Sequence, residues 1–217
     1  MSDFILVAGN LSTDAWNRLT KKNDYPSGGY LGGKVWNLII PALEAEHHRV
    51  FAPTLKDEHQ HNLSDNIELI SELIIEHDLK NIILVGASYC GMVITGIANK
   101  IPDRIGLLIY LDAVIPEEGQ SLVDIFHLAK FLCDDKINWP TYTEKLYFDP
   151  ETIKSLNKIY ILCTEKSSFA PVTSLMKQKI DEENHNWNLI KLPTSHVPMV
   201  TDPDKLIQLL LNLATSY

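Results

Sequence analysis

The sequence predicts an α/β fold with a mostly parallel central sheet and helices on both of its faces. Short apolar runs alternate with longer runs in which apolar residues recur at helical spacing. The chain of 217 residues is long enough for one sizeable core, and it contains no solenoid-type repeat and no Pro/Ser/Gly-rich tract. We therefore expect one domain over residues 1–217.

The expected strands and helices follow in a regular order. Six runs have the composition of buried strands, namely 4–8, 49–52, 81–85, 105–111, 159–163 and 187–192. Helical spacing or capping marks four further runs: 36–43, a helix from an N-cap at Ser64 to Ile74, 89–99, and a final helix with Asp202 as N-cap and Pro203 at its first position. Strands alternating with helices in this way are typical of a parallel sheet.

Two segments interrupt this alternation. Residues 11–34 form a long stretch with four glycines, and a loop of that length in a compact domain is usually functional. Residues 117–155 contain one helical piece followed by an aromatic-rich part, with Trp139, Tyr142, Tyr147 and Phe148. We expect the first segment to be a Gly-rich loop insertion and the second a small cap over the strand ends, and we expect both to line an apolar pocket.

Charge and cysteine content exclude several classes of partner. The net charge is −9 and the basic residues are scattered, which argues against a nucleic-acid partner. No apolar run reaches membrane-spanning length, and the N-terminus lacks the features of a signal peptide. The three cysteines, Cys90, Cys133 and Cys163, are odd in number. We expect a cytoplasmic protein that binds a small molecule and no membrane, and a homodimer is left open.

Ser88 stands at a sharp strand-to-helix turn. Residues 82–91 are predicted to form a strand, a tight turn and the start of a helix, which is the pattern of a nucleophile elbow. The strained backbone of such a turn presents the hydroxyl clear of the sheet, and the residues two before and two after it must be small. Gly86 meets this requirement, whereas Cys90 is larger than the usual glycine. We expect Ser88 to be a nucleophile, the alternative being a phosphate-binding or purely structural turn.

His196 is the expected general base. In chains with a nucleophile elbow the base follows the acid and comes late in the sequence. His196 lies in the loop between the last predicted strand and the final helix, where its side chain can reach over the strand ends. The alternative is an ordinary surface histidine, one of eight in the chain. Four other histidines lack neighbours at metal-ligand spacing, so no metal site is expected at His47, His48, His59 and His61.

Two carboxylates compete to orient the imidazole. Asp112 closes the strand that precedes the cap, and Glu165 lies in the loop after the next strand. Either strand end can bring a carboxylate to His196, where it would stabilise the cationic imidazole. Asp112 also suits a structural role, capping the turn before Pro116. The residues leave both acids open, and they place the backbone N–H of Tyr89 where it can stabilise an oxyanion.

Three segments in order resemble one family. They are VGASYCGMV at 85–93, YLDAVIPEEG at 110–119 and SHVPM at 195–199. They resemble the bacterial esterase-like branch of the α/β-hydrolases, which is related to plant methylesterases and hydroxynitrile lyases. The resemblance covers nearly the whole chain apart from most of 11–34 and a short cap. It implies an α/β-hydrolase fold, Ser88 and His196 as catalytic residues, and the backbone amides of Asn10 and Tyr89 as the oxyanion hole.

The resemblance also bears on the choice of acid. The usual aspartate, shortly after the strand that ends at Cys163, has no match, since Lys166 or Ser167 occupies its place. Haloalkane-dehalogenase-like relatives take their acid from the end of the earlier strand, where Asp112 falls. We therefore expect Asp112 to be the acid rather than Glu165.

The sequence thus predicts a serine hydrolase that cleaves a small carboxylic ester through an acyl-Ser88 intermediate, with no metal or organic cofactor. A second hypothesis is a weak or inactive homologue that binds a small apolar ligand, favoured by the unmatched acid position, Cys90 and Ala87. Hydroxynitrile lyase activity is disfavoured, because that branch has a threonine in the first loop and a lysine after the histidine, where Gly9 and Val197 stand.

Overall fold

A parallel sheet forms the centre of the computed structural model, which describes residues 2–131, 138–183 and 187–217. Among these residues six strands pair in the order β2-β1-β3-β4-β5-β6, and each pairing is parallel. Their bounds are β1 Asp3–Val7, β2 Arg49–Phe51, β3 Ile82–Ala87, β4 Ile105–Leu111, β5 Lys158–Cys163 and β6 Asn188–Leu192. The predicted α/β fold with a parallel sheet is confirmed.

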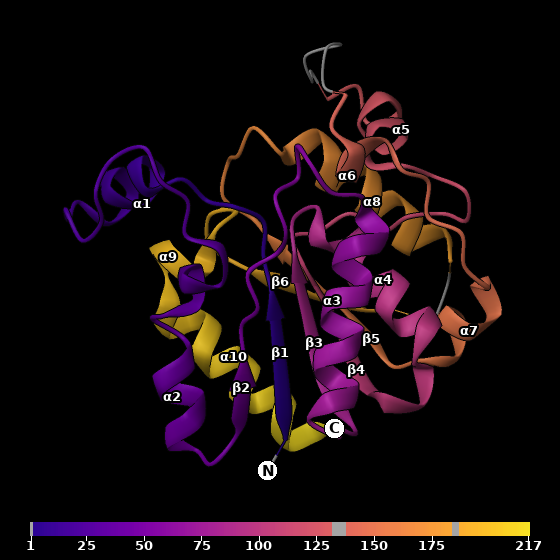
Figure 1. The fold of residues 1–217 in the computed structure, drawn as a ribbon, viewed down its shortest axis with the longest axis horizontal. Coiled ribbons are helices and arrows are strands. Elements are labelled where there is room, and N and C mark those ends of the chain that lie inside the picture. The colour runs from indigo at the N-terminus through magenta and orange to yellow at the C-terminus, as the bar shows by residue number, and fades with distance from the viewer. Residues whose placement is uncertain (1, 132–137, 184–186) are drawn as a thin grey trace.

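Helices cover both faces of the sheet (Figure 1). One face packs against α3 Leu63–Glu76, α4 Cys90–Lys100 and α8 Ala170–Glu182, and the other against α2 Ile40–Ala45, α9 Pro198–Thr201 and α10 Pro203–Ser216. Successive strand side chains point to opposite faces, so Ile5 and Val7 join one apolar core while Phe4 and Leu6 join the other. In the described part of the chain no helix is long and apolar enough to cross a membrane.

Some helix boundaries differ from the sequence-based expectation. Helix α3 begins at Leu63, and its N-cap is Asn62, which forms a capping box with Asp65. The prediction of Ser64 as N-cap was therefore wrong, since Ser64 instead donates to the Glu144 carboxylate through its backbone amide and hydroxyl, at 2.7 and 2.9 Å. The expected helix 36–43 is divided into the 3₁₀ helix η1 Gly32–Trp36 and α2.

Two of the later helices also differ from the expectation. Helix α8 was not among the expected elements. Helix α10 has Pro203 at its first turn as expected, but the Asp202 side chain forms no capping hydrogen bond and instead pairs with Lys205 at 3.0 Å. The short helix α9 lies between the loop that carries His196 and α10.

The segment 11–34 contains regular structure. Helix α1, Thr13–Thr20, begins at an N-cap formed by Ser12, which also pairs with Tyr30 in an isolated antiparallel bridge. Trp16 anchors this helix in the apolar core of one sheet face. The segment is therefore folded back on the body of the protein, rather than being a plain loop.

The cap expected over 117–155 includes residues 132–137, which lie outside the described residues, as does Cys133. Its described part contains three short helices, α5 Leu122–Leu128, α6 Pro140–Thr143 and α7 Pro150–Ser155. Figure 1 places α5 and α6 beyond the carboxyl ends of the central strands. Residues of the cap can therefore reach loops that follow β1, β2 and β3.

Gly91 is packed too tightly for any side chain. A Cβ atom built at this position would lie 1.9 Å from the backbone oxygen of Val114, whose own amide donates to the Ser88 carbonyl at 3.0 Å. Because backbone atoms cannot rotate away, we expect Gly91→Ala to lower the free energy of unfolding by about 1–3 kcal/mol. Thermal or urea unfolding measures this loss.

Gly29→Ala is the matched control for Gly91→Ala. A Cβ atom at Gly29 would meet only the Thr13 side chain, with its methyl carbon at 3.4 Å and its hydroxyl oxygen at 3.7 Å, which are ordinary contact distances. This variant should unfold like the native protein. Equal unfolding midpoints for the two variants would contradict the packing argument.

Candidate active site

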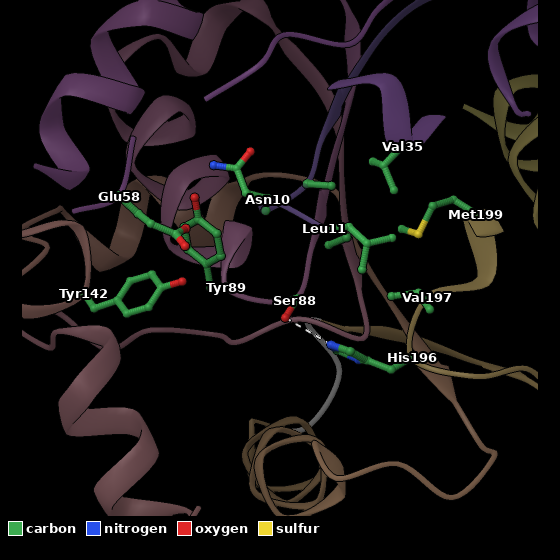
Figure 2. A pocket seen from close by; sticks show the side chains of 13 residues that line it. Asn10, Leu11, Val35, Glu58, Ser88, Tyr89, Tyr142, His196, Val197 and Met199 are labelled. Atoms are coloured by element: carbon green, nitrogen blue, oxygen red, sulfur yellow. Dashed lines mark hydrogen bonds between the residues drawn. The ribbon is translucent and has the colours of Figure 1, made fainter. Parts of the chain in front are cut away.

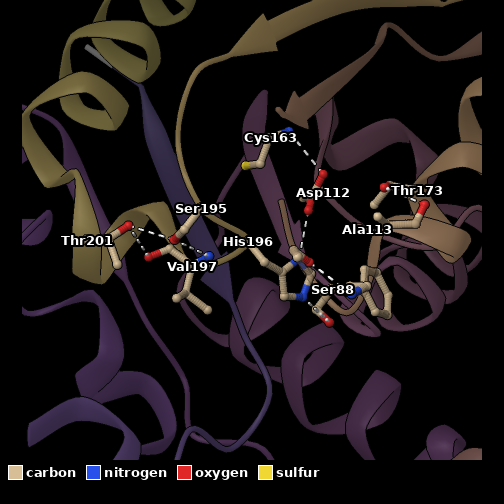
Figure 3. Close-up of polar contacts among 12 residues, drawn as sticks. Ser88, Asp112, Ala113, Cys163, Thr173, Ser195, His196, Val197 and Thr201 are labelled. Atoms are coloured by element: carbon tan, nitrogen blue, oxygen red, sulfur yellow. Dashed lines mark hydrogen bonds and ion pairs between the residues drawn. The ribbon is translucent and has the colours of Figure 1, made fainter. Parts of the chain in front are cut away.

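Three polar residues meet at the carboxyl ends of neighbouring strands. Ser88 directly follows β3, Asp112 directly follows β4, and His196 lies in the loop between β6 and α9. Figure 3 shows the three side chains joined in one line of hydrogen bonds. In a parallel sheet the carboxyl ends of the strands lie at one edge, so residues distant in sequence come together there.

Ser88 adopts the backbone of a tight elbow. Its φ angle is +57°, in the left-handed region that residues other than glycine rarely adopt. The turn is held to the end of β4 and to the segment that follows it, because the Ser88 amide donates to the Leu111 carbonyl at 3.2 Å and the Ser88 carbonyl accepts from the Val114 amide at 3.0 Å. A Cβ atom at Gly86 would lie 2.8 Å from the Cys90 carbonyl, so strand and helix approach as closely as the elbow requires.

A chain of hydrogen bonds links the serine to a buried carboxylate. His196 Nε2 lies 3.1 Å from Ser88 Oγ, and His196 Nδ1 lies 2.7 Å from Asp112 Oδ2. An ionised carboxylate can only accept, so Nδ1 carries the proton and Nε2 is free to accept the serine hydroxyl proton. This is the arrangement in which a histidine can serve as general base toward a serine.

Asp112 is held in place by β5. Its side chain is nearly fully buried, its Oδ1 accepts from the Cys163 amide at 3.0 Å, and its own amide donates to the Ile161 carbonyl at 2.8 Å. With a φ angle of +46°, the residue turns its carboxylate toward the histidine. The structure therefore brings Asp112 to His196, rather than using it to cap the turn before Pro116.

Glu165 lies apart from this line of hydrogen bonds. It is exposed, and its backbone amide donates to the Thr194 carbonyl at 3.1 Å. Within the described chain, no hydrogen bond joins its carboxylate to His196. Of the two candidate acids, the geometry brings only Asp112 into contact with the imidazole.

Two further contacts orient the imidazole. The Phe169 ring lies against it with centroids 4.4 Å apart and planes inclined by 35°. The loop itself is braced because Ser195 Oγ pairs with Thr201 Oγ1 at 2.7 Å and accepts from the Val197 amide at 3.2 Å. Neither Phe169 nor this brace was expected from the sequence. A hydrophobic residue before a helix does not indicate which side chain it will contact.

Asn10 and Tyr89 border the same space. Tyr89 follows Ser88 at the start of α4, and Asn10 lies in the loop after β1. Both residues line the cavity above the serine, and among the described residues neither amide has a hydrogen-bond acceptor. Two unengaged donors near a serine hydroxyl are what an oxyanion hole needs.

The cavity has a volume of about 250 Å³. Ser88 and His196 border it, and much of its wall is apolar, with Leu11, Val35 and Met199 among the lining residues (Figure 2). The cap contributes Tyr142, and the segment 11–34 contributes Leu11. None of the glycines of that segment lines this cavity, and Gly32 borders an adjacent one.

Glu58 is a cavity residue that the sequence reading missed. It lies in the loop between β2 and α3, and burial raises the pKa of its carboxyl, an effect that the facing Tyr142 hydroxyl opposes. In the sequence, Asp57, Glu58 and His59 resemble a solvated charged turn. The position after a strand end was the one available signal, because loops that follow parallel strands line the sites of such folds.

The buried thiols are not candidates for the nucleophile. Cys90 is fully buried in the apolar core, and burial raises its pKa well above that of a free thiol. Burial likewise raises the pKa of Cys163 to about 12. Over the described ranges, no group of three His, Cys, Asp or Glu side chains is placed to hold a metal ion.

Comparison with known proteins gives relatives among esterases and hydrolases. No protein-family model matches the chain. The carbendazim hydrolyzing esterase of Nocardioides sp. (strain SG-4G) is 28% identical over 236 residues, which cover 86% of this chain and 96% of that protein.

Two solved structures illustrate the likeness in fold. The crystal structure of polyneuridine aldehyde esterase matches with a TM-score of 0.72 at 18% identity, covering 99% of both chains. An extracellular α/β-hydrolase from a Paenibacillus species, described as a structural and functional homologue of tobacco salicylic acid binding protein 2, matches with a TM-score of 0.70 at 20% identity, covering 98% of both chains. At these identities the solved structures support a shared fold.

Proposed function

We propose that this chain, an α/β-hydrolase, cleaves small carboxylic esters by way of an acyl-Ser88 intermediate. The observation that carries the proposal is the continuous hydrogen-bonded line from Ser88 Oγ through His196 to the buried carboxylate of Asp112. The esterase named among its relatives, the Nocardioides carbendazim hydrolyzing enzyme, supports the same class of reaction.

Each step of the reaction can be assigned to a group of the chain. His196 Nε2 takes the hydroxyl proton as Ser88 Oγ attacks the ester carbonyl, and Asp112 stabilises the imidazolium that forms. The backbone amides of Asn10 and Tyr89 donate to the oxyanion of the tetrahedral intermediate. The imidazolium then protonates the leaving alcohol, and the same nitrogen removes a proton from the water that releases the acid.

The cavity favours compact substrates. A volume of about 250 Å³ lies just below the usual range for small-molecule sites, which is about 300–1,000 Å³. Its largely apolar wall suits the hydrocarbon part of an acyl or alcohol group. We therefore expect short esters to react faster than long ones.

Labelling with a fluorophosphonate probe tests the proposal. The probe reacts with a serine whose hydroxyl is activated, so the native protein should be labelled, and peptide mass spectrometry should place the label on Ser88. Ser88→Ala is the control and should remain unlabelled. A folded native protein that fails to react, and fails to hydrolyse a panel of p-nitrophenyl and methyl esters, would show a ligand-binding homologue instead.

A further inference from the structure

A carboxylate stands beside two tyrosines on the wall of the cavity. Glu58 comes from the loop after β2, Tyr89 from the elbow and Tyr142 from α6 of the cap, and all three line the same cavity as Ser88. In Figure 2 they gather to one side of the Ser88 hydroxyl, while His196 lies on the other. A substrate attacked by Ser88 therefore has a polar, aromatic wall beside it.

The hydroxyl of Tyr89 has no partner. Tyr89 is only 7% exposed, and its hydroxyl is a buried polar atom without a hydrogen bond in the described chain. Its ring packs edge-on against that of Tyr142, with centroids 5.4 Å apart. Buried polar atoms almost always have a partner, so an unpaired hydroxyl on a cavity wall indicates a place for a polar ligand group.

The carboxylate also lacks a counter-ion. Among the described residues Glu58 takes part in no ion pair, although Lys34 borders the adjacent cavity that Glu58 also lines. Burial raises the pKa of the Glu58 carboxyl, and the Tyr142 hydroxyl and His59 oppose this shift without cancelling it. The groups that face it are Asp57 and His59 of its own loop, with Tyr89 and Tyr142 from the elements packed against it.

We propose that Glu58, Tyr89 and Tyr142 form a recognition subsite for a protonated amine, so that the enzyme selects small esters that carry an aliphatic amino group. This inference rests on the proposed ester hydrolysis. A cation supplies the counter-charge that Glu58 lacks, and the electron-rich rings of the two tyrosines attract it further. An ammonium N–H can also donate to the free lone pairs of the Tyr89 hydroxyl.

Other occupants fit this wall less well. An anionic group would meet the carboxylate of Glu58, and the net charge of −9 adds no general attraction for anions. A purely apolar group would leave the buried Tyr89 hydroxyl without a partner and the half-buried Glu58 carboxylate without a counter-charge, which costs free energy.

Matched pairs of esters test the subsite. On the alcohol side, 2-(dimethylamino)ethyl acetate is compared with 3-methylbutyl acetate, which replaces the nitrogen by carbon. On the acyl side, ethyl 3-(dimethylamino)propanoate is compared with ethyl 4-methylpentanoate. The native enzyme should prefer the amine by about tenfold or more in kcat/KM for at least one pair, because hydrogen bonds to charged groups are the stronger ones.

Substitution of Glu58 gives the decisive comparison. Glu58→Gln should lower that preference by about tenfold, since the amide keeps the shape and loses the charge. Asp57→Asn removes the same charge from the same loop and should retain the native preference. Because each result is a ratio within one variant, a general change in activity does not affect it. A ratio near one in both native pairs, or a preference that survives Glu58→Gln, overturns the subsite and leaves ester hydrolysis standing.

Binding of stable analogues separates the subsite from the chemistry. If no ester is hydrolysed, the proposed function fails, and calorimetry in the Ser88→Ala background then decides the subsite. N-[2-(dimethylamino)ethyl]acetamide should bind more tightly than N-(3-methylbutyl)acetamide, and a second change, Glu58→Gln, should remove the difference. Equal or undetectable binding of both amides overturns the inference.

Discussion

Replacing either Ser88 or His196 by alanine should abolish nearly all ester turnover, with a loss on the order of 10⁴ to 10⁶-fold in kcat. Under the proposed mechanism the two side chains act as one unit, because the hydroxyl 3.1 Å from Nε2 is nucleophilic only while the imidazole can take its proton. Removing the second group after the first should therefore cost almost nothing more. Steady-state kinetics of the two single variants and the double variant, on one activated ester, measure this non-additivity.

Folding must be checked in the same samples. Ser88→Ala adds no charge and no larger side chain, so its thermal midpoint should stay close to that of the native protein. His196→Ala removes the hydrogen-bond donor of the buried Asp112 carboxylate, so its midpoint should fall, and its activity must be assayed well below that midpoint. Losses that multiply in the double variant would show that the two residues act independently. That result would contradict the proposed proton transfer from Ser88 to His196.

Asp112→Asn should lower kcat by about 10⁴-fold, while Glu165→Gln should leave it close to the native value. The carboxylate of Asp112 accepts from Nδ1 at 2.7 Å and so keeps the proton off Nε2. An asparagine nitrogen that donates to the imidazole reverses this tautomer, and no charge remains to stabilise the imidazolium. Glu165 is exposed and makes no described contact with the imidazole.

Kinetics of the two amide variants distinguish the two acids. Both substitutions remove one negative charge with little change in shape, so each serves as the control for the other. A large loss with Glu165→Gln together with retained activity in Asp112→Asn would require a rearranged loop after β5. That result would transfer the role of the acid to Glu165.

The sheet could be predicted because its strands carry their own signal. The buried runs around Ile83, Leu107 and Ile159 are continuous and apolar, as parallel strands covered on both faces must be. Helix α8 was missed because few of its residues are apolar, so the sequence pattern is weak. Only its packing in the structure reveals it. The N-cap of α3 was misplaced by two residues, since asparagine and serine both suit that position and the contact of Ser64 with Glu144 spans 80 residues.

The site could be predicted from the sequence only where a short local motif determines the backbone shape. The elbow around Ser88 combines a strand, a turn and a helix in ten consecutive residues, so its shape is local. Glu58 and Phe169 come from two separate segments, and only the tertiary fold brings Glu58 to the cavity and Phe169 against His196. The spacing of these residues along the chain does not predict such tertiary contacts.

The position of Asp112 at the end of β4 has a consequence for the neighbouring loop. Residues 164–168 follow β5, and their described contacts to the rest of the molecule include backbone hydrogen bonds to Leu192 and Thr194. Under the proposed mechanism the side chains of residues 164–168 take no part in proton transfer. Changes of side chain at the exposed positions 164–166 would therefore leave the reacting groups in place. A change of length would instead displace Phe169, whose amide donates to Ser167 Oγ at 2.9 Å and whose ring lies against the imidazole.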